Sequence, residues 1–411
     1  MALTGQFAPS VAFERTASAI ASARRAALAD RYAISSFAVE WRPLVELGAI
    51  ETQWRELAAR ALEPNIFYEP EFALAAAPVF GRDAGAVLVW SGTTPRKLVG
   101  LFPARPTRRR YGVKLPLLVG WTHPYAPLGT PLVERDAAEP TIAAWLAHLG
   151  GEPSLPALVL LPLIAEDGAF ATALAAIVQR AQMPCADFAR HRRAVLAPRG
   201  DRWDYLEHVL SAHRYKELRR MGRRLADSGA LLFTEATEPE RVAAALADFF
   251  ALEASGWKGK AGTAAAERDD VRRFVERAVG ALAAAGKVAI HRMLLDGRPV
   301  AAAILLRSAD TAWYWKTAYD ESLAHYSPGM FLTAVLTEDL AEDEAIARTD
   351  SVAAPGNSTL DHIWRDRIAL CDRLIAVRPQ APFARACRLE ALREFVLAAA
   401  KTVRARLRSA R

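Results

Sequence analysis

One short stretch, KTAYDESLAHYSPGMFL at residues 316–332, combines residue types that could bind an anionic group. Ser327 is a favourable N-cap residue, and Pro328 suits the first position of a helix. The first amides of such a helix have no partners within it, and with the positive end of the helix dipole they can bind a phosphate or pyrophosphate. Gly329 would let a bulky group approach closely. An ordinary helix start without a ligand is the alternative interpretation.

Polar and aromatic side chains flank this helix start on its N-terminal side. His325 and Tyr326 come directly before it, where they could contact a leaving group or a substrate. Trp315, Lys316 and Tyr319 lie at the end of an aromatic stretch that leads to the same place, and Lys316 could pair with a phosphate or a carboxylate. The alternative is that these side chains pack on a sheet, with Trp315 in a core.

The elements that would position these residues form a predicted three-stranded meander. Short turns, the first of them Asp296-Gly297, connect the segments KVAIHRMLL, RPVAAAILL and TAWYWKT. Before the meander the sequence predicts a basic helix at 211–229, a strand at LLFTEA and two helices joined by the loop GWKGKAG. Trp257 and Lys258 in this loop suit a segment that covers a flat or anionic substrate, although an exposed linker has the same composition.

The first half of the chain repeats this plan faintly. PRKLVGLFP at 95–103 and GRPVAAAIL at 297–305 are similar turn-and-strand segments that lie 202 residues apart. We therefore expect two α+β lobes, at 36–197 and 198–411, after a flexible leader at 1–35.

Three segments also resemble a known family. GWKGKAGTAA (256–265), WYWKTAYDESLAHYSPGMFL (313–332) and DSVAAPGNSTLDHIWRDR (350–367) are similar to the CelD-like acetyltransferases, a cellulose-biosynthesis-associated branch of the GNAT acyltransferases related to the Fem-type aminoacyl transferases. The resemblance is clear over residues 200–378 and faint over 40–197. It implies an α+β fold of two tandem GNAT-like lobes, each a mixed, mostly antiparallel sheet flanked by helices.

The resemblance assigns roles to individual residues. Asp350, at the end of a predicted strand, would act as a base or hold the amine, unless it is only a turn carboxylate; His325 and Tyr326 are the other catalytic candidates. The residues expected to bind acyl-CoA as the donor are Ser327, Gly329, Met330 and Phe331. The residues expected to bind the acceptor are Trp257, Lys258, Trp315, Lys316, Tyr319 and Asn357.

Composition limits the partners. The chain has 411 residues and a net charge of +7, which favours anionic partners. The basic clusters at 105–114 and 213–224 could bind the phosphates of a cofactor, a tRNA or an anionic membrane surface, or they are solvated faces; DNA is not expected. Three dispersed cysteines suggest neither a metal site nor disulfides and favour a reducing cytoplasm. No apolar run is long enough to span a membrane.

These observations lead to a cytoplasmic N-acyltransferase that moves an acetyl or longer acyl group from acyl-CoA to an amine. The acceptor would be a small molecule or a cell-envelope or exopolysaccharide precursor. Two alternatives remain open: aminoacyl transfer from tRNA, as in the Fem-type relatives, and a non-catalytic scaffold in polysaccharide assembly. A scaffold would have a closed cleft, whereas both transferases need an open one.

Overall fold

The computed structural model describes residues 11–92, 96–198, 204–256, 267–354 and 358–409. The strands are β1 (Phe37–Pro43), β2 (Gly85–Ser91), β3 (Leu98–Arg110), β4 (Val113–Gly120), β5 (Leu132–Val133), β6 (Leu158–Ala165), β7 (Cys185–Leu196), β8 (Leu231–Ala236), β9 (Val288–Leu295), β10 (Arg298–Ser308), β11 (Thr311–Tyr319), β12 (Arg348–Asp350) and β13 (Asp366–Ala376). The helices are α1 (Val11–Tyr32), α2 (Glu51–Ala59), α3 (Pro70–Phe80), α4 (Ala138–Gly151), α5 (Ala169–Arg180), α6 (Tyr205–Val209), α7 (Ala212–Ala226), α8 (Pro239–Ser255), α10 (Asp269–Ala284), α11 (Pro328–Glu342), α12 (Ser358–Ile363) and α13 (Phe383–Ser409).

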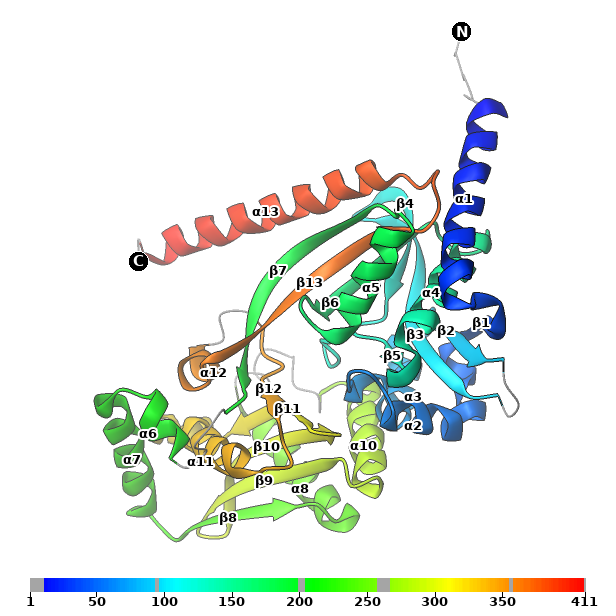
Figure 1. Ribbon diagram of the computed structural model, residues 1–411. Coiled ribbons are helices and arrows are strands. Elements are labelled where there is room, and N and C mark those ends of the chain that lie inside the picture. Colours follow the sequence, from blue (N-terminus) through cyan, green and yellow to red (C-terminus); the bar gives the residue numbers. More distant parts are fainter. Residues whose placement is uncertain (1–10, 93–95, 199–203, 257–266, 355–357, 410–411) are drawn as a thin grey trace.

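The strands of the described residues form one twisted sheet, in the order β1-β2-β3-β4-β6-β13-β7-β12-β11-β10-β9-β8, with β5 beside β3 (Figure 1). Counted inwards from either edge of the sheet, the first four strands are antiparallel to one another. The fourth strand then pairs in parallel with the next one, β4 with β6 in one half and β11 with β12 in the other. This confirms the expected mixed, mostly antiparallel α+β architecture and adds that the two sheets are continuous.

The two halves exchange strands at the centre of the sheet. β13, from the end of the chain, lies between β6 and β7, and the end of β7 in turn pairs with β12. The long β7–β13 ribbon therefore belongs to both halves. β3 and β10, which contain the two similar sequence segments, hold matching positions third from each edge.

Helices cover both faces of the second half of the sheet because β10 alternates two apolar sets of side chains. Ala302, Ile304 and Leu306 belong to the core that includes α8 and α10. Ala301, Ala303 and Leu305 belong to the core that includes α11. The helix start predicted at Ser327 or Pro328 is the N-terminus of α11, so it lies on the sheet beside β11.

The segment expected as a flexible leader differs from the prediction, since most of it forms α1. Leu28 and Tyr32 near the end of α1 are buried in the core that includes α4, and this burial holds the helix on the first half. None of the helices in the described part of the chain combines the length and apolar character needed to cross a bilayer.

Side chains from the two halves contact each other directly, between α3 with the residue before it and the segment from α10 to β10. Phe72 of α3 packs edge-on against Phe274 of α10, with ring centroids 5.4 Å apart. The buried carboxylate of Glu69 accepts hydrogen bonds from Lys287 Nζ, at 2.6 Å, and from the Ser308 hydroxyl. Burial raises the pKa of Glu69, and the Lys287 ammonium opposes this rise. These contacts fix the orientation of the halves around the site.

Candidate active site

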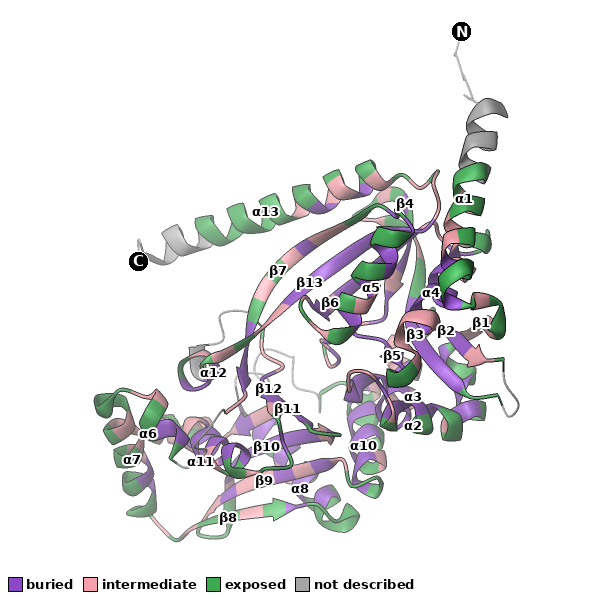
Figure 2. Ribbon diagram, in the orientation of Figure 1, coloured by how far each residue is buried: buried purple, intermediate pink, exposed green. Residues whose placement is uncertain are grey.

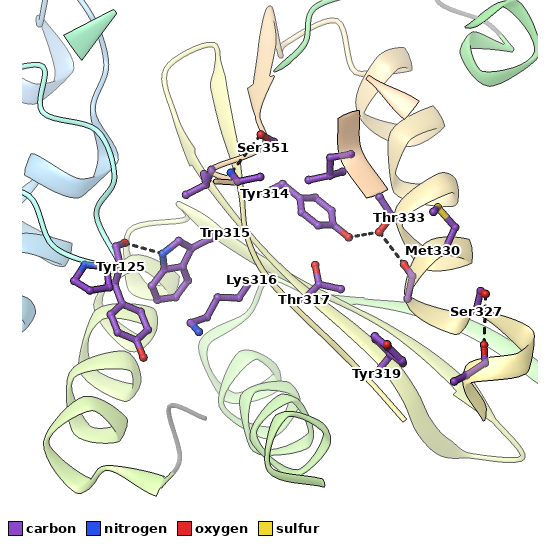
Figure 3. A pocket seen from close by; sticks show the side chains of 16 residues that line it. Tyr125, Tyr314, Trp315, Lys316, Thr317, Tyr319, Ser327, Met330, Thr333 and Ser351 are labelled. Atoms are coloured by element: carbon purple, nitrogen blue, oxygen red, sulfur yellow. Dashed lines mark hydrogen bonds between the residues drawn. The ribbon is translucent and has the colours of Figure 1, made fainter. Parts of the chain in front are cut away.

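A cavity of about 640 Å³ opens beside β11, at the N-terminus of α11 (Figure 3). Its walls come from β11, from the first turns of α11, from the chain after β12 and from one loop of the first half. The lining residues are Pro124, Tyr125, Tyr314, Trp315, Lys316, Thr317, Tyr319, Ala324, Ser327, Gly329, Met330, Thr333, Ser351, Val352, Ala353 and Leu360.

The cavity exists because two parallel strands separate. β11 and β12 pair only from Thr311 to Trp313, and the chain after β12 then turns away at Val352, whose φ is +54°. Among the described residues, no strand pairs with this edge of β11 from Tyr314 to Tyr319. The backbone groups along the edge can therefore hydrogen-bond an extended ligand, as strand edges do with added peptides.

The first turn of α11 ends the cavity. Phe331 donates the first backbone hydrogen bond of the helix to the Ser327 carbonyl, and Pro328 has no N–H. The amides of Gly329 and Met330 precede that bond, so helix geometry leaves them free for an anion. Ser327 has a φ of 51° and its hydroxyl does not cap the helix, contrary to the capping role that its sequence position favours.

A hydrogen-bonded chain fixes this turn on the strand. The Tyr314 hydroxyl and the Thr333 hydroxyl are 2.9 Å apart, and Thr333 donates to the Gly329 carbonyl at 2.7 Å. A Cβ added to Gly329 would lie 2.9 Å from Cδ1 of Tyr319, so the glycine lets the turn approach the strand. Burial raises the pKa of Tyr314, which stays neutral and can hold this geometry.

Residues of the first half close the other end of the cavity. Trp315 Nε1 donates to the carbonyl of Tyr125 at 2.9 Å, and Lys316 Nζ lies 4.7 Å from the centre of the Tyr125 ring. Lys316 also pairs with the buried carboxylate of Glu253, at 3.2 Å. Burial, followed by the Glu253 charge, raises the pKa of Tyr125. This end combines a cation with two aromatic rings, a surface suited to a polar acceptor.

A histidine in the same loop does not add an acid or base. The ring of His123 stacks on Phe80 with centroids 4.3 Å apart and has Phe72, Trp121 and Phe274 around it. This burial lowers the pKa of His123 to about 3. The imidazole is therefore neutral near pH 7 and supports the loop by packing.

The structure brings six of the predicted residues to the cavity: Ser327, Gly329, Met330, Trp315, Lys316 and Tyr319. Phe331 is not among the lining residues, because its ring packs against Gly222 of α7 and Phe233 of β8. His325 and Tyr326 lie in the turn before α11 and are also outside the lining. Trp257, Lys258 and Asn357 lie outside the described residues.

Asp350 does not face this cavity. Its carboxylate accepts from Arg193 at 2.5 Å and from the amide of Val352 at 2.9 Å, and both ion-pair partners are buried. It lines a separate cavity of about 240 Å³ between the halves. The contacts of Asp350 are those of a turn carboxylate and ion-pair partner, the structural alternative to the base.

Sequence reasoning missed the cavity residues that come from distant segments. Tyr125 follows Trp121 at the spacing at which Tyr319 follows Trp315, but such a similarity can only indicate a repeat and does not place Tyr125 at a site. Thr333 lies one helical turn after Gly329, a spacing that places both on one face of a helix that begins at Pro328. Glu253, which pairs with Lys316 but does not line the cavity, had no local signal.

Residues 212–357 match the family model of the acetyltransferase (GNAT) domain. In the described residues, no cluster of three or more His, Cys, Asp or Glu side chains could hold a metal ion. A search of curated proteins finds no significant match.

Two solved structures share the fold over most of both chains. FemX has a TM-score of 0.54 and 9% identity, with 80% of this chain and 96% of that chain covered. The C-terminal domain of a protein described as a lysylphosphatidylglycerol synthetase, from Agrobacterium fabrum, has a TM-score of 0.50 and 12% identity, with 84% and 96% covered. At these identities the similarity establishes the fold alone.

Proposed function

We propose that this chain, which carries a GNAT-type acetyltransferase domain over residues 212–357, transfers an acetyl or longer acyl group from acyl-CoA to an amine. One observation carries the proposal. The unpaired edge of β11 leads directly to the free amides at the start of α11, inside a cavity large enough for an elongated ligand. Acyl-CoA carries pantetheine amides followed by a pyrophosphate. The amides can pair with the edge of β11, and the pyrophosphate can bind the free amides of α11.

The donor residues follow from that match. The edge of β11 would hold the pantetheine amides, and the amides of Gly329 and Met330 would hold the pyrophosphate. Tyr314 and Thr333 act as positioning residues, because their hydrogen bonds set the distance between the strand and the helix. Bound in this way, acyl-CoA supplies the activated carbonyl, and the protein keeps it in reach of the amine.

We place the acceptor at the opposite end of the cavity, beside Tyr125, Trp315 and Lys316. The acceptor would be an amine on a small molecule or on a cell-envelope or polysaccharide precursor. The described lining contains no carboxylate or imidazole, so water at the mouth of the cavity takes the amine proton. His325 lies between the lining residues Ala324 and Ser327 but is not itself in the lining. Its role as an alternative proton acceptor stays a prediction.

A specific observation favours a second candidate, aminoacyl transfer from tRNA. α7 exposes six basic side chains: Arg214, Lys216, Arg219, Arg220, Arg223 and Arg224. Arg224 lies 5.7 Å from the ring centre of Tyr326, close to Ser327 at the cavity. A polyanion on α7 would therefore reach the same cavity. The open cavity disfavours the third possibility, a scaffold, which predicts a closed cleft.

The test separates these candidates. Purified protein is titrated with acetyl-CoA and longer acyl-CoAs, and thiol release is then measured with a panel of amines. Micromolar binding and amine-dependent release of CoA would support the proposal. If no acyl-CoA binds, but an aminoacyl-tRNA binds in a salt-dependent manner that Arg219→Glu and Arg220→Glu weaken, the second candidate replaces it.

A further inference from the structure

The C-terminal helix α13 is held on the outside of the molecule by specific contacts (Figure 1). The buried carboxylate of Glu390 accepts from Arg110 Nε at 2.7 Å and from the Tyr111 hydroxyl at 2.9 Å, both in the hairpin of β3 and β4. Glu394 accepts from the amide of Ala189. α13 thus has a defined position beside the hairpin.

Most of the described part of α13 after Glu390 is exposed (Figure 2), and several of the exposed side chains are apolar. Leu392, Phe395, Val396 and Val403 are 57%, 72%, 55% and 56% exposed. Their spacing places them on one face of the helix, which we call the α13 stripe. Isolated apolar side chains are common on protein surfaces, but a continuous row of them usually marks a binding surface.

Basic side chains extend the α13 stripe towards the start of the helix. Helical spacing places the exposed Arg385 and Arg388 on the face of the stripe, two turns and one turn before Leu392. Arg108, Arg109 and Lys114 are exposed on the hairpin that binds Glu390, on the opposite face of α13. None of these five side chains forms an ion pair with any residue that the structure describes. By sequence, α13 contains seven basic and two acidic residues, and both acidic side chains are occupied by the anchoring contacts.

This combination identifies the partner. A second copy of the chain would bring the same positive charges together, which disfavours self-association. RNA is read by base stacking on aromatic rings, and most of the α13 stripe is aliphatic. Aliphatic and Phe side chains on a basic helix match the interface of an anionic bilayer, where the apolar row enters the headgroup region and the cations meet phosphates.

We propose that α13, through its apolar stripe and the arginines Arg385 and Arg388 on the same face, docks the protein on an anionic membrane surface. The docking face shares no residue with the cavity beside β11. The proposal therefore holds whether or not the cavity binds acyl-CoA.

Sedimentation of full-length protein with lipid vesicles tests this inference. The vesicles are phosphatidylcholine alone, or two parts phosphatidylcholine to one part phosphatidylglycerol. Protein should bind the anionic vesicles, bind less at high salt, and stay in the supernatant with phosphatidylcholine alone. The variant Phe395→Ser/Val396→Ser should lose most of the binding with an unchanged melting temperature, since both positions are exposed.

Matched charge variants locate the surface. Arg385→Gln/Arg388→Gln should lower the vesicle partition coefficient about 25-fold, since each basic residue at an anionic surface contributes a factor of about five. Arg219→Gln/Arg220→Gln on α7 removes the same charge elsewhere and should change the coefficient less than about twofold by the same argument.

Four outcomes would overturn the proposal. The first is no binding to anionic vesicles, and the second is equal binding by all variants. The third is an RNA complex that the Phe395→Ser/Val396→Ser variant weakens. The fourth is a dimer in solution that this variant dissociates, which would assign the α13 stripe to a second copy.

Discussion

The absence of a side chain at Gly329 allows the first turn of α11 to lie close to β11 at the cavity. Its position has Cδ1 of Tyr319 only 2.9 Å from an added Cβ, and the contact is to a ring that lines the same cavity. The two free amides of the α11 start depend on this close approach. Side-chain size at one residue therefore decides how near the anion-binding turn can lie to the strand.

The variant Gly329→Ala should bind acetyl-CoA at least about fivefold more weakly, since overpacking at this contact costs about 1–3 kcal/mol and displaces the turn. Titration calorimetry measures the affinity. Gly280→Ala in α10 is the matched control, because nothing lies within 4 Å of an added Cβ there. Unchanged affinity in Gly329→Ala would place the donor elsewhere.

Asp350 is predicted to stabilise the fold rather than to catalyse. Asp350→Asn leaves the buried Arg193 guanidinium without its counter-charge and should lower the free energy of unfolding by about 3 kcal/mol. Urea denaturation measures this. Asp270→Asn, at an exposed pair with Arg268, should leave stability unchanged.

Activity of the same variant discriminates the two roles. Below its melting temperature, Asp350→Asn should turn over at a rate close to that of the wild type. A folded variant with a hundredfold lower kcat would restore Asp350 as the base.

These residues also indicate what sequence can predict. Ser327, Gly329 and Met330 were predictable as a group because one helix start follows one strand in the sequence, and local propensity places both. The partner of Asp350 was not predictable, since Arg193 lies 157 residues away and reaches it only through the pairing of β7 with β12. Phe331 was misplaced because the side of α11 that it occupies depends on where α7 packs.

At the scale of elements, a loop of the first half completes a cavity built by the second. The loop after β4 reaches the middle of β11, and the hydrogen bond from Trp315 to the carbonyl of Tyr125 connects them. The meander itself was predictable from its turns and alternating residues. The loop contact was not, because it depends on how α3 and α10 pack the halves together.

Loosening that connection should affect the acceptor more than the donor. Trp315→Phe removes one hydrogen bond, which contributes about 1 kcal/mol, so the KM for the acceptor amine should rise about fivefold while acetyl-CoA affinity stays unchanged. Steady-state kinetics and calorimetry separate the two effects. Trp90→Phe also removes an indole hydrogen bond, to Glu40, and is the control remote from the cavity. A change in donor affinity alone would contradict the placement of the acceptor.

At the scale of the whole molecule, the exchanged strands join two similar halves in one sheet, and we expect them to unfold as one cooperative unit. The faint repeat at 95–103 and 297–305 predicted two lobes, and the strand order agrees with it. The exchange of β7 and β13 could not be predicted from the sequence, since both strands are long, similar in character and equally able to pair within their own half.

Separate expression tests the cooperative unit. A fragment of residues 36–197 lacks β13, and a fragment of residues 198–411 lacks β7, so neither should give a cooperative thermal transition, whereas the full chain should unfold in one. Circular dichroism during heating measures this. Two stable fragments with independent transitions would show that the halves are autonomous.

We propose that acyl-CoA lies along β11 with its pyrophosphate at the start of α11. Hydrogen exchange with and without acetyl-CoA measures this binding at the backbone amides themselves. We predict slower exchange in residues 314–319 and 329–332 and no change in β2 or α13. Protection elsewhere with none in these two segments, or no protection at saturating acetyl-CoA, would show that acyl-CoA does not bind along β11.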